Sequence, residues 1–264
     1  MTVPSVALSL TGSGHLLIYQ LGACRVLSKS SSLHIHQVVG SSGGAIVATL
    51  MALNLDLDAF AQSFLRTRGQ ALSLLQEQLQ RDIIMKGPAL SICTTQCRDG
   101  REHMFDFSIG STSLDPRLMP ALIASCRIPG SFHPFDILSS TNSFADSEGV
   151  RIDDNFYVDG GIAAPAPPTL STLRRIIVSP IAGKSLSSKS DDNSWRVSPN
   201  GSPFCLPMTL RHNFRVDASV ANVRALRAAV GMTTGSELRS WYQKGQDDAR
   251  RFEEETLESH SSEE

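Results

Sequence analysis

Ser42 has the surroundings of a catalytic nucleophile. It is the central serine of Gly40-Ser41-Ser42-Gly43-Gly44, a G-x-S-x-G pentapeptide. The β-branched pair Val38-Val39 comes before it, and the run Ala45 to Leu53, apolar apart from one threonine, comes after it. A strand, a sharp turn and a buried helix in this order form a nucleophile elbow, with the serine hydroxyl at its tip. The Gly43 N–H at the helix start could stabilise an oxyanion. The alternative is a Gly/Ser-rich turn without chemistry.

A glycine-rich loop near the N-terminus is the second feature suited to chemistry. Val6 to Leu10 predicts a buried strand, Thr11-Gly12-Ser13-Gly14 a tight loop, and Leu16 to Leu27 a helix. Such a loop points backbone N–H groups at negative charge, either a phosphate or an oxyanion. A dinucleotide-binding fingerprint needs a third glycine where this chain has Leu17, and the loop has no lysine, so an anion- or nucleotide-binding module is disfavoured.

Asp159 is the third feature. It ends the β-type run Phe156-Tyr157-Val158 and is followed by Gly160-Gly161. Active sites of α/β proteins lie at the carboxyl ends of strands, which is where this acid is expected. An ordinary Asp-Gly turn would have the same sequence.

These features require a scaffold in which strands and helices alternate. Strand, helix, strand, helix is the order over the first 53 residues, which predicts an α/β fold with a central, mostly parallel sheet flanked by helices. Residues 90–108 predict a β-hairpin. We expect a core over residues 1–182, a mobile loop over 183–203, C-terminal helices over 204–252 that complete the same domain, and an acidic disordered tail over 253–264.

Composition excludes several classes of protein. The chain has 264 residues, 41% of them hydrophobic, and a formal net charge of −2, which gives no basic surface for nucleic acid. Five widely spaced cysteines favour a reducing compartment over a disulfide framework. The N-terminus is a poor signal peptide, and no apolar run reaches the length of a transmembrane helix. His34 and His36 lack a third metal ligand, so we interpret them as facing solvent.

Four motifs in order resemble the patatin-like phospholipase family. They are Gly12-Ser13-Gly14 with Tyr19-Gln20-Leu21-Gly22, the block from Gly40 to Ala45, Ala124-Ser125 with Pro129, Phe132 and Pro134, and Asp159-Gly160-Gly161. The segment Gly245 to Phe252 is similar to a C-terminal helix of the family. The resemblance covers about Val6 to Pro168 well and the rest weakly.

The resemblance implies a serine lipid acyl hydrolase of phospholipase A or acylglycerol lipase type, with a Ser42–Asp159 dyad. The implied oxyanion hole comprises Gly12, Ser13, Gly14 and Gly43. Asp159 is a useful base only if burial raises its pKa from about 3.9. We expect no cofactor and no metal. The expected partner is a lipid substrate, and the expected location is cytoplasmic, with peripheral contact at membranes or lipid droplets. The oligomeric state is open.

Three alternatives stay open. A Ser-Asp-His triad would need His212, because His260 lies in the acidic tail. Leu16 and Leu17 depart from the family loop, which commonly ends in a further glycine, so a weak or inactive lipid-binding scaffold is the second alternative. The third is a transacylase that passes the acyl group to an alcohol instead of water.

Overall fold

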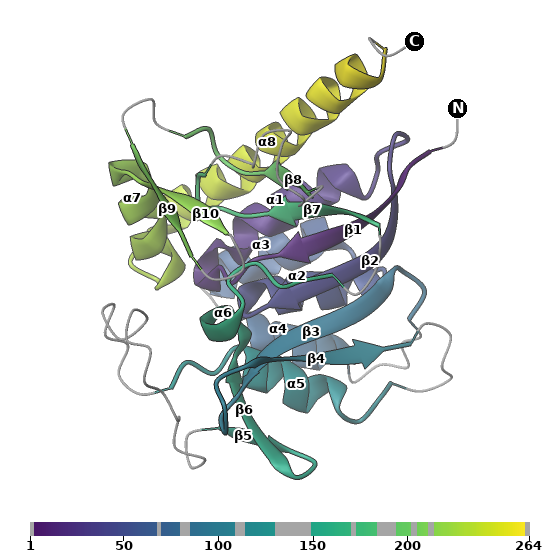
Figure 1. Cartoon of the computed structure of the whole chain (residues 1–264), viewed down its shortest axis with the longest axis vertical. Helices are drawn as coiled ribbons and strands as arrows, with labels where there is room; N and C mark the ends of the chain where they lie inside the picture. The colour runs from purple at the N-terminus through teal and green to yellow at the C-terminus, as the bar shows by residue number, and fades with distance from the viewer. Residues whose placement is uncertain are drawn as a thin grey trace.

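The computed structural model describes residues 3–67, 70–79, 85–108, 114–129, 149–169, 173–183, 194–201, 205–210 and 214–261 (Figure 1). The strands are β1 (Ser5–Leu10), β2 (His34–Ser41), β3 (Ala89–Gln96), β4 (Glu102–Phe107), β5 (Val150–Ile152), β6 (Asn155–Asp159), β7 (Arg174–Val178), β8 (Ser194–Val197), β9 (Leu206–Thr209) and β10 (Arg215–Ala218). The helices are the 3-10 turn η1 (Gly14–Leu16), α1 (Leu17–Leu27), α2 (Gly43–Ala52), α3 (Leu57–Thr67), α4 (Ala71–Leu79), α5 (Leu118–Ser125), α6 (Gly160–Ala163), α7 (Val220–Ala229) and α8 (Gly235–Ser261).

One mixed sheet organises the molecule. Its order is β5-β6-β3-β2-β1-β7-β8, with β4 paired to β3 outside this path. Within the run β3-β2-β1-β7-β8, each strand pairs parallel with the next, whereas the pairings that involve β4, β5 or β6 are antiparallel. The predicted α/β fold with a mostly parallel sheet is therefore confirmed, and β3 with β4 forms the predicted hairpin.

The core explains why the central segments are so apolar. β1 is buried from Val6 to Leu10, and every residue of α2 is buried. Strands in a parallel sheet are covered by helices, so they are nearly continuous hydrophobic runs rather than alternating ones. Figure 1 shows α1 to α4 gathered behind the sheet. In the described part of the chain, no helix is both long and apolar enough to cross a bilayer.

Helices α1 and α8 pack at very close range. A Cβ added at Gly22 would lie 2.1 Å from the Tyr242 carbonyl oxygen, and one at Gly245 would lie 2.0 Å from the Tyr19 carbonyl oxygen. Both positions therefore need glycine, one on each helix. This contact joins the C-terminal helix to the first helix of the core.

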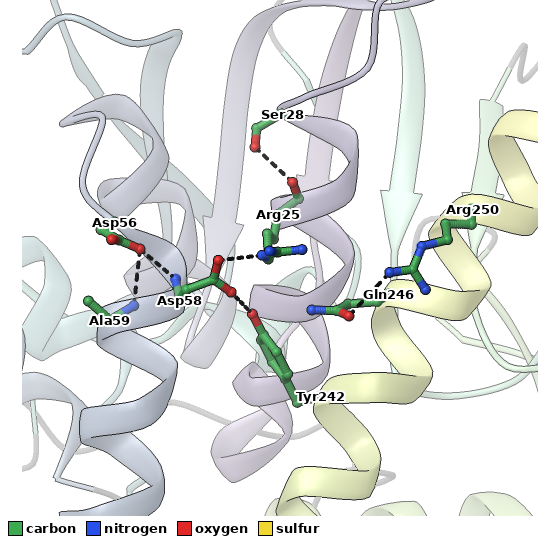
Figure 2. A network of polar contacts seen from close by, with 8 residues as sticks. All are labelled: Arg25, Ser28, Asp56, Asp58, Ala59, Tyr242, Gln246 and Arg250. Carbon is green, nitrogen blue, oxygen red and sulfur yellow. Dashed lines mark hydrogen bonds and ion pairs between the residues drawn. The ribbon is translucent and has the colours of Figure 1, made fainter.

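Polar side chains also connect α1 and α8, through α3 (Figure 2). Asp58 on α3 accepts hydrogen bonds from Arg25 on α1 and from the Tyr242 hydroxyl on α8. Asp56 accepts the N–H groups of Asp58 and Ala59 at 2.9 and 3.0 Å, which satisfies orphan donors at the start of α3. Three helices from distant parts of the sequence thus share one carboxylate.

The C-terminal third differs from the expectation. Helix α8 continues to Ser261, through residues that the sequence assigns to a disordered tail from residue 253. Strand β8 lies within the segment expected to be a mobile loop, and β9 and β10 precede the C-terminal helices. Residues 184–193 and 202–203 of the expected loop lie outside the described residues.

Candidate active site

Ser42 occupies a strained turn between β2 and α2. Its φ is 52° and its ψ is −129°, in a region that favours glycine and costs other residues about 1–3 kcal/mol. The turn ends the strand at Ser41 and starts the helix at Gly43, as the pentapeptide predicts. The first N–H groups of α2 have no acceptor within the helix, so the Gly43 N–H lies where a negative oxygen could be bound.

Ser125 on α5 holds this turn in place. The Ser42 N–H donates to the Ser125 Oγ at 2.8 Å, and that hydroxyl donates to the Cys93 carbonyl oxygen on β3 at 2.7 Å. The Ser125 side chain is fully buried, so both of its hydrogen bonds are shielded from water. Ala124-Ser125 carries part of the family resemblance, but the sequence indicates no role for this hydroxyl.

The loop Gly12–Gly14 lies directly against this turn. A Cβ added at Gly12 would be 3.6 Å from the Ser42 Cβ, and one added at Gly43 would be 2.7 Å from the Gly14 carbonyl oxygen. Gly14 has a φ of 49°, and a Cβ there would be 2.2 Å from the Ala229 carbonyl oxygen, so only glycine fits. The predicted oxyanion loop is therefore adjacent to the predicted nucleophile, while the roles of its N–H groups stay a prediction.

Gln20, a fully buried residue of α1, supports the loop from below. Its Oε1 accepts the Ser13 hydroxyl at 2.9 Å. Its Nε2 donates to the Thr11 carbonyl oxygen at 2.9 Å and to the Val178 carbonyl oxygen at 3.2 Å. One side chain thus ties the loop to the end of β7.

Asp159 is a buried carboxyl at the end of β6. Its Oδ1 accepts the Gly161 N–H at 2.8 Å, which makes Asp159 the N-cap of α6. Burial raises its pKa from 3.8 to about 6, while the Ser42 side chain and the Gly161 N–H oppose that shift. Among the described residues, its Oδ2 has no hydrogen-bond partner. The Ser42 side chain, which lowers this pKa, is therefore close to the carboxyl.

Strand β3 brings Ser42 and Asp159 together. Ser41 ends β2 opposite Cys93, and Asp159 ends β6 opposite Thr94, the next residue of β3. Strand β4 occupies the other edge of β3 at Thr94, so β2 and β6 must share one edge. They run toward each other along it and end there. Ser42 and Asp159 consequently meet where the two strands stop.

The remaining candidates lie elsewhere. His34 and His36 are at the start of β2, with ring centroids 6.5 Å apart. The described residues contain no group of three side chains able to hold a metal ion. His212, the candidate for a triad, lies outside the described residues, as do Phe132 and Pro134 of the family block. In the part of the chain that the structure describes, the five cysteines form no disulfide.

Comparisons with known proteins identify the family. The model of the family described as patatin-like phospholipase matches residues 8–170, more than half of the chain, and this range includes all four ordered motifs. No curated protein matches. The crystal structure of VipD from Legionella pneumophila is similar, with a TM-score of 0.42 and 11% sequence identity. The match covers 94% of this chain and 66% of VipD, so the chain spans just under two thirds of that protein's length.

Proposed function

Because the chain belongs to the patatin-like phospholipase family, we propose that it hydrolyses fatty-acyl esters of lipids with Ser42 as nucleophile and Asp159 as base. Family membership supports a lipid acyl hydrolase in general. One observation carries the finer proposal. Strands β2 and β6 end next to each other on one edge of β3, so that a serine in a strained turn lies beside a buried carboxyl whose pKa is raised to about 6.

The first half-reaction forms an acyl-enzyme. The Ser42 Oγ attacks the ester carbonyl carbon while its proton passes to Asp159. A carboxylate with a pKa near 6 is mostly ionised at neutral pH and is a better base than an ordinary aspartate. Catalytic hydrogen bonds are often long in empty sites and shorten when substrate binds, so we expect the contact between the two groups to tighten in the complex.

Backbone N–H groups stabilise the tetrahedral intermediate. Its oxyanion is bound by the N–H of Gly43 at the start of α2 and by the loop containing Gly12, Ser13 and Gly14. One such donor is typically worth about 2.7–4 kcal/mol in the transition state. The C–O bond to the alcohol then breaks, and protonated Asp159 returns its proton to the leaving oxygen.

The second half-reaction regenerates the enzyme. Asp159 takes a proton from water, the hydroxide oxygen attacks the acyl carbon, and the fatty acid leaves as Ser42 recovers its proton. The acyl ester belongs to a phospholipid, an acylglycerol or a related lipid, as the family implies. No cofactor takes part in this sequence of steps.

Labelling with a fluorophosphonate, followed by peptide mapping, tests the proposal. We expect the label on Ser42 in the wild type, no label in Ser42→Ala, and much slower labelling in Asp159→Asn. Ser41→Ala is the matched control, because Ser41 is in the same peptide and its buried Oγ has no hydrogen-bond partner in the described structure. This variant should label as the wild type does.

Two results would count against the dyad. A folded wild type that takes no label would indicate a scaffold that binds lipid without turnover. Rapid labelling of Asp159→Asn would assign the base to another residue, and His212→Asn would then be the next variant to label. Acyl transfer to an added alcohol, measured against release of free fatty acid, would distinguish a transacylase.

A further inference from the structure

Exposed apolar side chains gather on one part of the molecule. Among the described residues, ten large hydrophobic side chains are exposed, and seven of them lie between Leu206 and Met232. Two are on β9, and the rest are on α7 or just after it. Figure 1 shows β9, β10 and α7 together at one side of the molecule. Scattered exposed apolar residues are ordinary, but a group of them marks a binding surface.

Helix α7 packs with its small residues and exposes its large ones. Ala225 and Ala228, three residues apart, are buried against Leu16. Val223 and Leu226 are 58% and 57% exposed on the other side. A helix on a protein surface ordinarily does the reverse, with large apolar side chains facing the core. The exposed stripe is therefore suited to a further partner.

Positive charge accompanies the apolar stripe. Arg224 and Arg227 are exposed and follow the exposed Val220 and Val223 by four residues each, so they lie beside them on the helix. The sequence of α7 contains no acidic residue. Glu237 at the start of α8 has its pKa lowered by hydrogen bonds from two threonines and, less strongly, by Arg227. An apolar stripe bordered by arginines is the pattern of a helix that lies at a membrane surface.

This helix also contacts the candidate active site. The Ala229 carbonyl oxygen at its C-terminal end is 3.3 Å from the His15 Nδ1, and it closes the space next to Gly14. The exposed stripe thus belongs to the element that packs on the proposed oxyanion loop. A lipid surface in contact with α7 would be next to the catalytic serine.

We propose that α7 and β9 form the surface by which the protein docks on a phospholipid bilayer with anionic headgroups, and we call it the docking surface. The choice of lipid rests on the proposed function, which needs access to acyl esters in a lipid assembly. Val223 and Leu226 enter the boundary between headgroups and acyl chains, and Arg224 and Arg227 bind lipid phosphates.

Vesicle flotation tests the docking surface. All binding is measured in the Ser42→Ala background, so that lipid turnover cannot alter the vesicles. The vesicles contain phosphatidylcholine alone or with about 30% phosphatidylserine as the anionic lipid. We expect Val223→Gln with Leu226→Gln to lose at least about tenfold in partitioning to the mixed vesicles, because each apolar side chain that enters lipid contributes roughly one order of magnitude. Glutamine is a good helix former, so α7 is retained.

A matched control and a charge variant sharpen the experiment. Val3→Gln removes an exposed apolar side chain just before β1 and should bind as the parent does. Figure 1 shows the start of β1 on the opposite side of the molecule from α7. Arg224→Gln with Arg227→Gln should lose the preference for phosphatidylserine, and the preference of the parent should fall with added salt. Thermal unfolding reports whether each variant is folded.

The outcomes separate the docking surface from the proposed function. Equal binding by the parent and by folded Val223→Gln/Leu226→Gln would overturn the docking surface. The docking surface would also be overturned if the parent does not bind vesicles but forms a dimer, and the double glutamine variant does not dimerise. That result would identify a second copy of the chain as the partner of this surface. Hydrolysis of a soluble short-chain ester by the wild type is assayed separately, and its absence would overturn the proposed function without changing the flotation result.

Discussion

Replacing Asp159 by asparagine should change the stability of the protein in a way that depends on pH. Burial raises the pKa of this carboxyl from 3.8 to about 6. The folded protein therefore binds this proton more tightly than the unfolded chain does, and its stability falls as the pH rises from about 4 to about 6. The shift is about 2.2 units, which at about 1.36 kcal/mol per unit gives a loss of about 3 kcal/mol at neutral pH.

The amide that replaces this carboxyl carries no ionisable proton, so the variant escapes this loss. We expect the free energy of unfolding of Asp159→Asn minus that of the wild type to be about 2–3 kcal/mol larger at pH 8 than at pH 4, so the variant gains in relative stability as the pH rises. Urea unfolding at several pH values measures it, provided that the slope with denaturant is unchanged. Asp154→Asn is the control for removing a charge, because the Asp154 side chain is 98% exposed.

The same carboxyl connects stability to catalysis. The kcat/KM of the wild type on a soluble ester should rise with pH through an apparent pKa of about 6, and Asp159→Asn should lose about 10²–10⁴-fold in kcat. A stability difference that stays constant from pH 4 to pH 8 would refute the reasoning. It would mean that the buried carboxyl is not desolvated enough to act as the base.

Three further substitutions probe the frame of the site. Ser125→Ala removes the hydroxyl between the nucleophile's N–H and β3, and kcat on a soluble ester should fall about ten- to hundredfold with little change in KM, with Ser125→Thr as a partial rescue. Gly14→Ala should lower the free energy of unfolding by at least about 1–3 kcal/mol in urea, whereas Gly235→Ala, with open space around it, should not. Gln20→Leu leaves buried carbonyl and hydroxyl groups unpaired, so the urea midpoint should fall by the equivalent of about 1–3 kcal/mol, and an unchanged midpoint would remove Gln20 from the support of the loop.

The parallel part of the fold could be predicted because its signals are local. Apolar strands, a glycine-rich turn and a buried helix follow one another over the first 53 residues, and each is specified within its own segment. The pairing of β6 with β3 could not be predicted in this way, because antiparallel register between distant segments depends on non-local contacts. The sequence predicts Asp159 at a strand end, but no local pattern places that strand end next to Ser42.

The C-terminal helix shows a limit of composition. The acidic residues after 252 favour disorder when counted alone. In the structure they continue α8, where Arg251 is within 3.8 Å of Glu255 one turn later and 3.0 Å from Asp248 one turn earlier. Charge pairs at helical spacing stabilise a helix that composition does not reveal.

Ser125 shows a limit of motif analysis. Its position next to Ala124 marked it as part of a family block, but a hydroxyl that bridges two backbone groups leaves no signature of charge or spacing. Only the contact between α5, β3 and the elbow reveals what it does. A serine that follows a small residue at the end of a buried apolar helix was the one available signal.

The meeting of β2 and β6 on one edge of β3 has a consequence for how this chain can change in length. The spacing of Ser42 and Asp159 depends on the register of three strands and not on the segments that connect them. Insertions in those segments leave the spacing intact. Deletion of one residue within β6 would move Asp159 by about 3.3 Å and turn its side chain to the other face of the sheet. Insertions and deletions should therefore preserve the spacing of Ser42 and Asp159 when they fall between the strands, and disrupt it when they fall within a strand.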